Sequence, residues 1–184
     1  MSASPRRSTE RLHLGRVSSA GAVYFVTFVT ACRTPWLGKP VATAAMLNVL
    51  RAWHAERDGT VLAAVVMPDH VHVLFELGQR LDVGRCVSRW KTEGRKGSGY
   101  AGAWQRDFWE HRVRNEESLE DYGLYIFLNP YRAGLLARNE TWPGCWVPEP
   151  KRFIFMELLG ATGEPAEGWI EWSEDWFVGL VTGE

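Results

Sequence analysis

Two histidines and, later in the chain, a tyrosine and an asparagine have side chains suited together to metal-assisted phosphoryl transfer. His70 and His72 are two residues apart in an apolar run, so on a strand their imidazoles point to the same face. Neighbouring imidazoles bind divalent metal ions. The alternative is a pair of ordinary hydrogen-bonded histidines, although two polar rings are costly in an apolar strand unless something satisfies them. The residues alone leave both interpretations open.

Tyr125 and Asn129 are four residues apart and therefore share one face of a helix. A tyrosine hydroxyl attacks phosphorus only with help, because its ordinary pKa is about 10, and a nearby metal ion supplies that help. The Asn129 amide oxygen is a candidate third metal ligand. The simpler interpretations are a core aromatic for Tyr125 and a helix cap or turn before Pro130 for Asn129. Tyr122, three residues before Tyr125, is the rival nucleophile.

The elements that must position these residues follow from the apolar patterning. Segments dense in β-branched and aromatic residues predict strands, and helical spacing of apolar residues predicts helices. The expected strands are 23–30, 61–67, 70–77 and 104–113, and the expected helices are 41–57, 81–93 and 115–129. This order predicts an α+β fold: an antiparallel sheet with helices packed mainly on one face.

Several boundaries depend on single residues. The short break at Pro68 and Asp69 predicts an antiparallel hairpin between the second and third strands. Asn115 followed by acidic residues predicts a helix start with Asn115 as its N-cap. Pro130 predicts that this helix ends or is interrupted there, with a possible resumption over 133–138. Residues 94–102 are expected to form a loop.

Charge is distributed unevenly along the chain, although the net formal charge is only −1. Residues 1–16 carry +3 (four Arg, one Glu), residues 80–114 carry +5 (nine Lys/Arg, four Asp/Glu), and residues 148–184 carry −6 (two Lys/Arg, eight Asp/Glu). A basic middle and an acidic tail indicate a polyanion-binding face and a tail able to compete for it. The alternative is a set of ordinary solvated charges.

The basic middle segment holds the candidate nucleic-acid contacts. In the helix expected over 81–93, the apolar residues Leu81, Val83, Val87 and Trp90 are expected to point inward. The basic residues Arg85, Arg89 and Lys91 are expected to point outward. Cations along this segment are suited to a phosphate backbone, and its aromatic rings to unpaired bases, with core packing as the alternative for each tryptophan. The candidates are Arg85, Arg89, Lys91, Arg95, Lys96, Trp90, Tyr100 and Trp104.

The cysteine count and hydropathy limit the classes of protein. Three widely separated cysteines argue against a disulfide framework or a zinc knuckle and fit a reducing cytoplasm. The sequence contains no run of 18 apolar residues, so it predicts no membrane-spanning helix. The Arg-rich N-terminal segment lacks the apolar stretch of a secretory signal peptide. We therefore expect a cytoplasmic protein that associates with the nucleoid.

Three blocks of the sequence together resemble a known family. Residues 67–74, MPDHVHVL, resemble the HUH signature (His, bulky hydrophobe, His) of single-tyrosine transposases. Residues 104–114, WQRDFWEHRVR, and 125–135, YIFLNPYRAGL, resemble two later blocks of the REP-associated tyrosine transposases, which are relatives of the IS200-type transposases. The resemblance spans roughly residues 24–136.

The resemblance implies an HUH endonuclease (ferredoxin-like) fold that cleaves and rejoins single-stranded DNA, at REP-like hairpins, through a 5′-phosphotyrosine. By position it makes His70, His72 and Asn129 the metal ligands and Tyr125 the nucleophile, with Mg or Mn as the divalent metal. His111 matches a motif position without an assigned role. The implied partner is single-stranded or hairpin DNA, with no membrane, and the protein is expected to be a monomer or homodimer.

Two other functions compete with this one. The first is a nucleic-acid-binding domain of the same fold without catalysis, and the second is a metal-dependent hydrolase unrelated to DNA. A DNA cleavage assay with manganese separates the three, because a covalent adduct supports only the transposase.

The expected organisation is a flexible basic N-terminus (1–20), a tyrosine transposase domain (21–147) and an acidic, Trp-rich extension (148–184). If residues 169–176 are helical, Trp172 and Trp176 form one stripe that anchors the tail beside the basic segment. A chain ending at Val147 is then expected to bind single-stranded DNA more tightly at low salt. The alternative is that the tail completes the core and its removal unfolds the protein.

Overall fold

One antiparallel sheet organises the protein, whose computed structural model describes residues 18–171. The strands lie in the order β4-β1-β3-β2-β5, so β3 is central between β1 and β2, and all the pairs are antiparallel. Their bounds are β1 Val23–Val29, β2 Gly59–Val66, β3 His70–Leu77, β4 Trp109–Arg112 and β5 Cys145–Trp146. The hairpin expected between the second and third strands is confirmed as β2 and β3.

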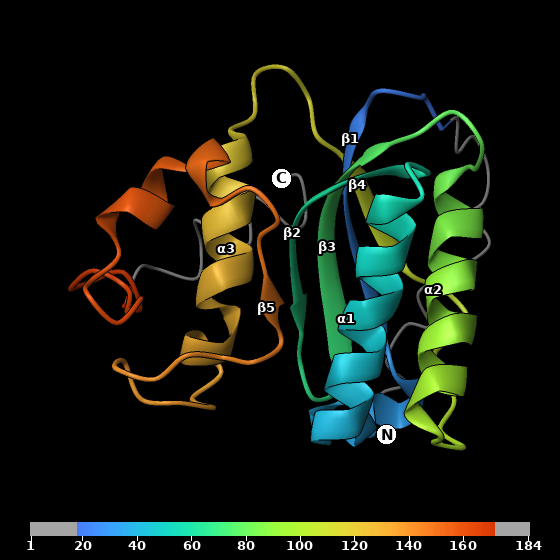
Figure 1. Ribbon diagram of the computed structural model, residues 1–184, viewed down its shortest axis with the longest axis horizontal. Helices are drawn as coiled ribbons and strands as arrows, with labels where there is room; N and C mark the ends of the chain where they lie inside the picture. Colours follow the sequence, from blue (N-terminus) through green and yellow to red (C-terminus); the bar gives the residue numbers. More distant parts are fainter. Residues whose placement is uncertain (1–17, 172–184) are drawn as a thin grey trace, which may run out of the picture.

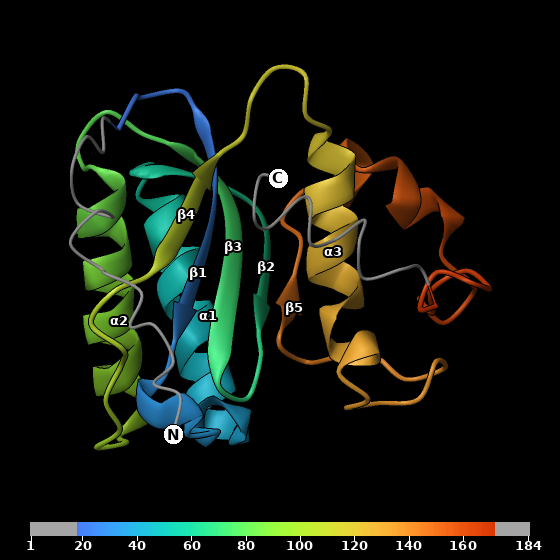
Figure 2. The same ribbon diagram turned by 180° about the vertical axis from the view of Figure 1, so that it is seen from behind.

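Helices cover both faces of the sheet, two on one face and one on the other (Figures 1 and 2). Helices α1 (Pro40–Ala55) and α2 (Val83–Ser98) lie side by side on the first face. Helix α3 (Leu119–Arg132) lies on the opposite face, mainly along β2 and β3. Short 3₁₀ turns complete the chain: η2 Ala31–Arg33, η3 Trp36–Gly38, η4 Pro150–Arg152 and η5 Ile154–Leu158. The predicted α+β class is therefore confirmed.

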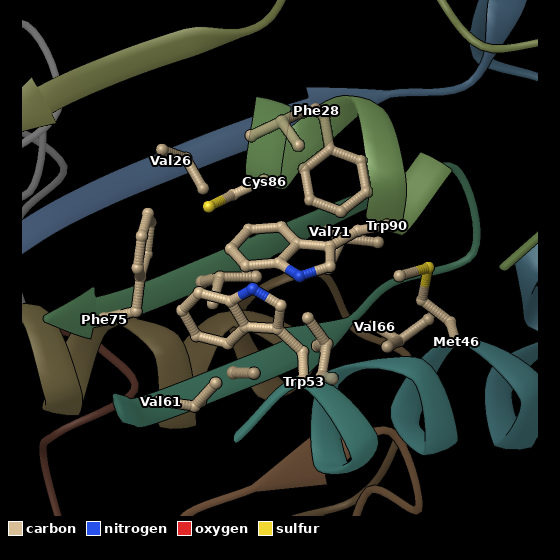
Figure 3. Close-up of a cluster of buried hydrophobic side chains, with 14 of the residues drawn as sticks. Val26, Phe28, Met46, Trp53, Val61, Val66, Val71, Phe75, Cys86 and Trp90 are labelled. Carbon is tan, nitrogen blue, oxygen red and sulfur yellow. The ribbon is translucent and has the colours of Figure 1, made fainter. Parts of the chain in front are cut away.

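Large aromatic side chains fill the space between the sheet and the first two helices (Figure 3). Trp53 of α1 and Trp90 of α2 meet edge to face, with ring centroids 5.0 Å apart, and both rings also contact Phe75 of β3. All three side chains are buried. The expectation that Trp90 points inward is confirmed, and stacking on DNA bases is excluded for Trp90, because its ring is part of this core.

Helix α2 is longer than the patterning predicted, and the loop expected over 94–102 is largely wrong. The helix continues to Ser98 because Gly94 serves as a contact point between helices. A Cβ built on Gly94 would lie 2.7 Å from Met46 Sδ of α1. The missing side chain thus allows α1 and α2 to approach closely, which the sequence pattern could not distinguish from a helix break.

The strand expected over 104–113 is regular only over its second part, β4. Trp104 forms an isolated bridge with Thr30. Between Trp104 and β4, Lys91 Nζ donates hydrogen bonds to the carbonyls of Gln105 (2.9 Å) and Asp107 (3.2 Å). These two carbonyls accept their hydrogen bonds from the Lys91 side chain and not from the backbone of a neighbouring strand. The expectation that Lys91 points outward is wrong, because its side chain is buried.

Both ends of α3 differ from the sequence prediction. The N-cap is Ser118 and not Asn115, since Ser118 Oγ accepts a hydrogen bond from Asp121 N. Pro130 lies inside the helix, which ends at Arg132 and does not resume over 133–138. Pro130 has no amide hydrogen to donate within the helix, but the helix continues for two more residues, and the Ala133 amide still reaches the Asn129 carbonyl (3.0 Å).

The described part of the acidic extension packs against α3. Phe153 and Phe155 are buried in the same cluster as Tyr122, and Glu120 of α3 accepts hydrogen bonds from the backbone of Ile154 and Phe155. The expected stripe of Trp172 and Trp176 lies outside the described residues, as does the basic segment 1–16. None of the described helices has the length and hydropathy needed to cross a membrane.

Candidate active site

His70 and His72 lie on the α3 side of the sheet, at the start of β3. Their ring centroids are 4.7 Å apart, with the rings nearly perpendicular. The intervening Val71 and the following Val73 point to the opposite face and are buried beneath α1 and α2. The pleat of one strand therefore separates a polar pair from the main core, as the spacing predicted.

Each imidazole is fixed through its Nδ1 atom. His70 Nδ1 is 2.6 Å from Asp69 Oδ1, and His72 Nδ1 is 2.7 Å from Thr27 Oγ1 on the neighbouring strand β1. The remaining ring nitrogen of each histidine is Nε2. A metal-binding histidine is commonly oriented in this way by a second hydrogen bond.

Burial keeps both imidazoles neutral. It lowers the pKa of His70, although the Asp69 carboxylate partly opposes the shift. It lowers the pKa of His72 further, and the nearby His70 and Arg33 add to this effect. Burial also tends to raise the pKa of Asp69, but hydrogen bonds from His70 and Arg33 outweigh it and hold this pKa below its usual value. Neutral imidazole is the form that binds a metal ion.

Tyr125 and Asn129 of α3 meet the histidine pair. The Tyr125 ring lies edge-on to His72, with centroids 5.3 Å apart. The Asn129 side chain is hydrogen bonded to both His70 and Tyr125. Burial raises the pKa of Tyr125, while the hydrogen bond from Asn129 and the charge of Arg132 act in the opposite direction. Tyr125 is thus a neutral phenol at rest, beside two groups that favour its phenolate.

The rival tyrosine belongs to a different cluster. Tyr122 is fully buried, and its hydroxyl is hydrogen bonded to Glu117. Glu117 also binds His111 Nε2 (2.9 Å) and the backbone amide of Arg114 (2.6 Å). Burial and this carboxylate raise the pKa of Tyr122 strongly. These properties make Tyr122 a poor nucleophile and give His111 a structural partner.

The residues of the site fit a divalent cation. Within residues 18–171, no three side chains of the types His, Cys, Asp and Glu are grouped so that they alone could hold a metal ion. The candidate ligands are the two imidazoles and the Asn129 amide oxygen, which is a set of borderline and hard donors. The amide contacts one of these imidazoles directly. Two imidazole nitrogens and one amide oxygen can hold a divalent metal ion that keeps positions for other ligands.

The candidate DNA contacts on α2 do not join this site, because α2 lies on the other face of the sheet. Arg89 is bound in ion pairs to Glu56 and Asp58 (2.8 Å each) and to Glu93 (2.9 Å). Arg85 pairs with Asp82, and Lys91 is buried. The cations in this set that remain exposed are Arg85, Arg95 and Lys96.

The aromatic candidates near α2 are also engaged within the protein. Trp104 is partly buried, with its ring 5.2 Å from Phe28 and its Nε1 donating to the Lys91 carbonyl (2.8 Å). The Tyr100 ring stacks on Trp36. The structure therefore gives these rings packing roles and does not place them beside the histidines.

Sequence reasoning missed two residues that orient the histidines. Asp69 directly precedes His70, and this adjacency was an available signal. Thr27 lies 45 positions away from its partner His72, and only the register of β1 on β3 pairs them. A pattern within one segment cannot reveal such a partner.

One α+β fold thus brings a paired-histidine strand of an antiparallel sheet against a tyrosine-bearing helix. The chain belongs to the IS200-like transposase family, whose model matches residues 18–126. The match includes both histidines and Tyr125 but ends before Asn129.

The relatives are REP-associated tyrosine transposases. One from Escherichia coli is 32% identical over 91 residues, which cover 48% of this chain and 54% of that protein, about half its length. One assigned to the same group in Haemophilus influenzae is 28% identical over 142 residues, covering 67% of this chain and 78% of that protein. A solved REP-associated tyrosine transposase bound to a REP hairpin shares the fold, with a TM-score of 0.57 and 24% identity over 78% of this chain and 82% of that chain.

Proposed function

We propose that this protein is a metal-dependent transposase that cleaves and rejoins single-stranded DNA through a 5′-phosphotyrosine at Tyr125. The observation that carries the proposal is the position of the Tyr125 ring, whose centroid is 5.3 Å from that of His72, which in turn lies 4.7 Å from that of His70. It joins the candidate metal ligands and the candidate nucleophile in one site. Family membership supplies the reaction class.

In the cleavage step the Tyr125 oxygen attacks the scissile phosphorus. An O–P bond forms to the tyrosine, the bond from phosphorus to the 3′ oxygen breaks, the phenol proton passes to solvent and the leaving oxygen takes up a proton. The phosphotyrosine conserves the free energy of the phosphodiester, so a second 3′-hydroxyl can reverse the attack and join a new strand. Hydrolysis by water would lose this bond and would suit a simple nuclease.

The surrounding residues prepare Tyr125 for this attack. Asn129 and Arg132 both favour the phenolate, against the effect of burial. His70, His72 and Asn129 would hold the divalent cation, which supplies positive charge against the developing charge on the phosphate oxygens. Asp69 and Thr27 hold the imidazoles in the orientation that presents Nε2.

The substrate class that we propose is single-stranded DNA carrying a REP-like hairpin. It is supported by the relatives, one of which has been solved with a REP hairpin. An aromatic strip on the same sheet face suits an unpaired strand, because Trp109 is partly exposed and its ring stacks on His111 with an interplanar angle of 9°.

A covalent-capture assay tests the proposal. The full chain is mixed with Mn²⁺ and a labelled pool of single strands, each with a hairpin stem and randomised flanks, and is then resolved on a denaturing gel. We expect a labelled protein band that is absent with EDTA. Strand binding without an adduct would favour the alternative function, a nucleic-acid-binding domain that does not catalyse.

A further inference from the structure

The turn after β1 carries two consecutive non-glycine residues in the left-handed region. Cys32 has φ 54° and Arg33 has φ 51°. This conformation costs roughly 1–2 kcal/mol per residue for side chains with a Cβ, so it persists only where the surroundings impose it. The turn therefore points to a constraint on where the Arg33 side chain lies.

Hydrogen bonds hold this turn against the start of β3. The buried Thr30 donates from both its backbone amide (2.8 Å) and its hydroxyl (3.0 Å) to the Asp69 carbonyl. The Ala31 amide donates to the Ala103 carbonyl (2.8 Å). The turn is thus fixed beside the residue that precedes the first candidate metal ligand.

The Arg33 guanidinium lies at the edge of the histidine pair. Its Nη1 atom donates to Asp69 Oδ2 at 3.0 Å, while the other oxygen of the same carboxylate binds His70 Nδ1. The Arg33 side chain is nevertheless 66% exposed. A guanidinium has five N–H groups, so the contact with Asp69 leaves donors for another partner.

We propose that Arg33 binds a phosphate of the DNA strand next to the scissile phosphate, with Asp69 holding its guanidinium in place. The inference rests on the proposed function and adds a residue that contacts the substrate. A planar guanidinium binds phosphate through two parallel N–H groups, which a lysine cannot do. The competing explanation is that Arg33 only neutralises Asp69 and thereby orients His70.

The first experiment measures phosphate binding without catalysis. The full chain and Arg33→Gln are titrated against fluorescein-labelled dT20 in EDTA at several KCl concentrations. We expect about three- to tenfold weaker binding at low salt and a salt slope smaller by about 0.7, the value for one lost contact on a single strand. Arg51→Gln is the matched control, because Arg51 is exposed on α1, on the opposite face of the sheet, and is expected to change neither quantity.

The second experiment locates the contact. A strand that the wild type cleaves is prepared with one neutral methylphosphonate at each position in turn. On most of these strands we expect Arg33→Gln to form adduct more slowly than wild type. On the one strand whose neutral group replaces the phosphate bound by Arg33, we expect the two rates to be equal, because wild type has lost the same contact. Arg33→Lys, which retains the charge, is expected to keep the salt slope and recover part of the affinity, even if Arg33→Gln proves unstable.

The outcomes separate the two hypotheses. If Arg33→Gln matches Arg51→Gln in affinity and slope, or loses adduct equally on every methylphosphonate strand, the phosphate contact is overturned while wild-type adduct still supports the proposed function. If the wild type forms no adduct but Arg33→Gln lowers the salt slope, the proposed function fails and the phosphate contact stands.

Discussion

Thr27 Oγ1 lies 2.7 Å from His72 Nδ1, across the pair formed by the central strand β3 and its neighbour β1. The two residues are register partners in the sheet, so the backbone itself holds the hydroxyl beside the imidazole. His72 is buried and cannot obtain this hydrogen bond from solvent. The threonine therefore sets the orientation of a candidate metal ligand without being a candidate ligand itself.

The first prediction is that Thr27→Val weakens metal binding. Valine keeps the shape and β-branching but removes the hydroxyl, and losing such an orienting hydrogen bond typically costs about 10–100-fold in metal affinity. Calorimetric titration with Mn²⁺ measures the effect, with Thr60→Val, at the far end of β2, as a control in the same sheet. Equal Mn²⁺ affinity in both variants would show that Thr27 has no orienting role.

The second prediction distinguishes the two tyrosines. Tyr125→Phe removes one hydroxyl and is expected to abolish the covalent DNA adduct while leaving DNA affinity within about twofold of wild type. Tyr122→Phe is expected to retain adduct formation and to lose about 1–2 kcal/mol of stability, because it removes the hydrogen bond between the buried Tyr122 hydroxyl and Glu117. Denaturing gels and thermal melts on both variants measure this. Adduct in Tyr125→Phe but not in Tyr122→Phe would reassign the nucleophile.

The sequence predicted those parts of the site that depend on spacing within one element. Alternation on β3 placed both histidines on one face, and the four-residue spacing on α3 placed Tyr125 and Asn129 together. These predictions succeed because strand and helix periods fix side-chain direction locally. That β3 and α3 meet was implied only by the family resemblance.

The sequence could not predict contacts that tertiary packing decides. Lys91 follows the charge pattern of an exposed helix face, yet it is buried because an irregular segment needed donors for its carbonyls. Gly94 has the pattern of a helix break, yet it is where α2 approaches Met46. In each case the residue that makes the deciding contact lies elsewhere in the sequence. The local composition and the periodicity of apolar residues therefore cannot reveal that contact.

The third prediction concerns Lys91, for which we expect a structural role. Lys91→Met is expected to leave the affinity for dT20 within about twofold of wild type and its salt slope unchanged, because the ammonium binds backbone carbonyls and not solvent. Fluorescence anisotropy against KCl concentration measures both quantities. A slope reduced as in a lost phosphate contact would return Lys91 to the DNA-binding set.

The same variant has a predicted pH dependence. Burial lowers the pKa of Lys91 from 10.5 to about 8, so between these values the unfolded chain binds more protons at this residue than the folded protein. The free energy of unfolding of wild type, relative to Lys91→Met, is therefore expected to rise as pH increases from 8 to 10.5, by about 3 kcal/mol at most. Urea denaturation at several pH values measures it, and a falling difference would contradict the burial of the charge.

The acidic extension requires two different truncations, because its described part belongs to the core. Phe153 lies against Gly123 so closely that a Cβ on this glycine would be 2.4 Å from its ring. Removing a buried Phe side chain typically costs about 3–5 kcal/mol, against a total stability of roughly 5–15 kcal/mol. A chain ending at Val147 loses both Phe153 and Phe155, so we expect it to be largely unfolded at 25 °C by circular dichroism.

The last prediction separates this packing role from autoinhibition. A chain ending at Glu171 retains every contact described for the extension and removes Glu174, Asp175 and Glu184, a charge of −3. If the acidic tail competes with DNA, this chain should melt like the full protein and bind dT20 more tightly at low salt, with the gain shrinking as salt screens the repulsion. Anisotropy at low and high KCl measures the gain. The same truncation with Glu174 and Asp175 retained, ending at Asp175, is the control and should recover most of the lost repulsion. Unchanged affinity in the folded chain ending at Glu171 would leave the tail with no effect on DNA binding.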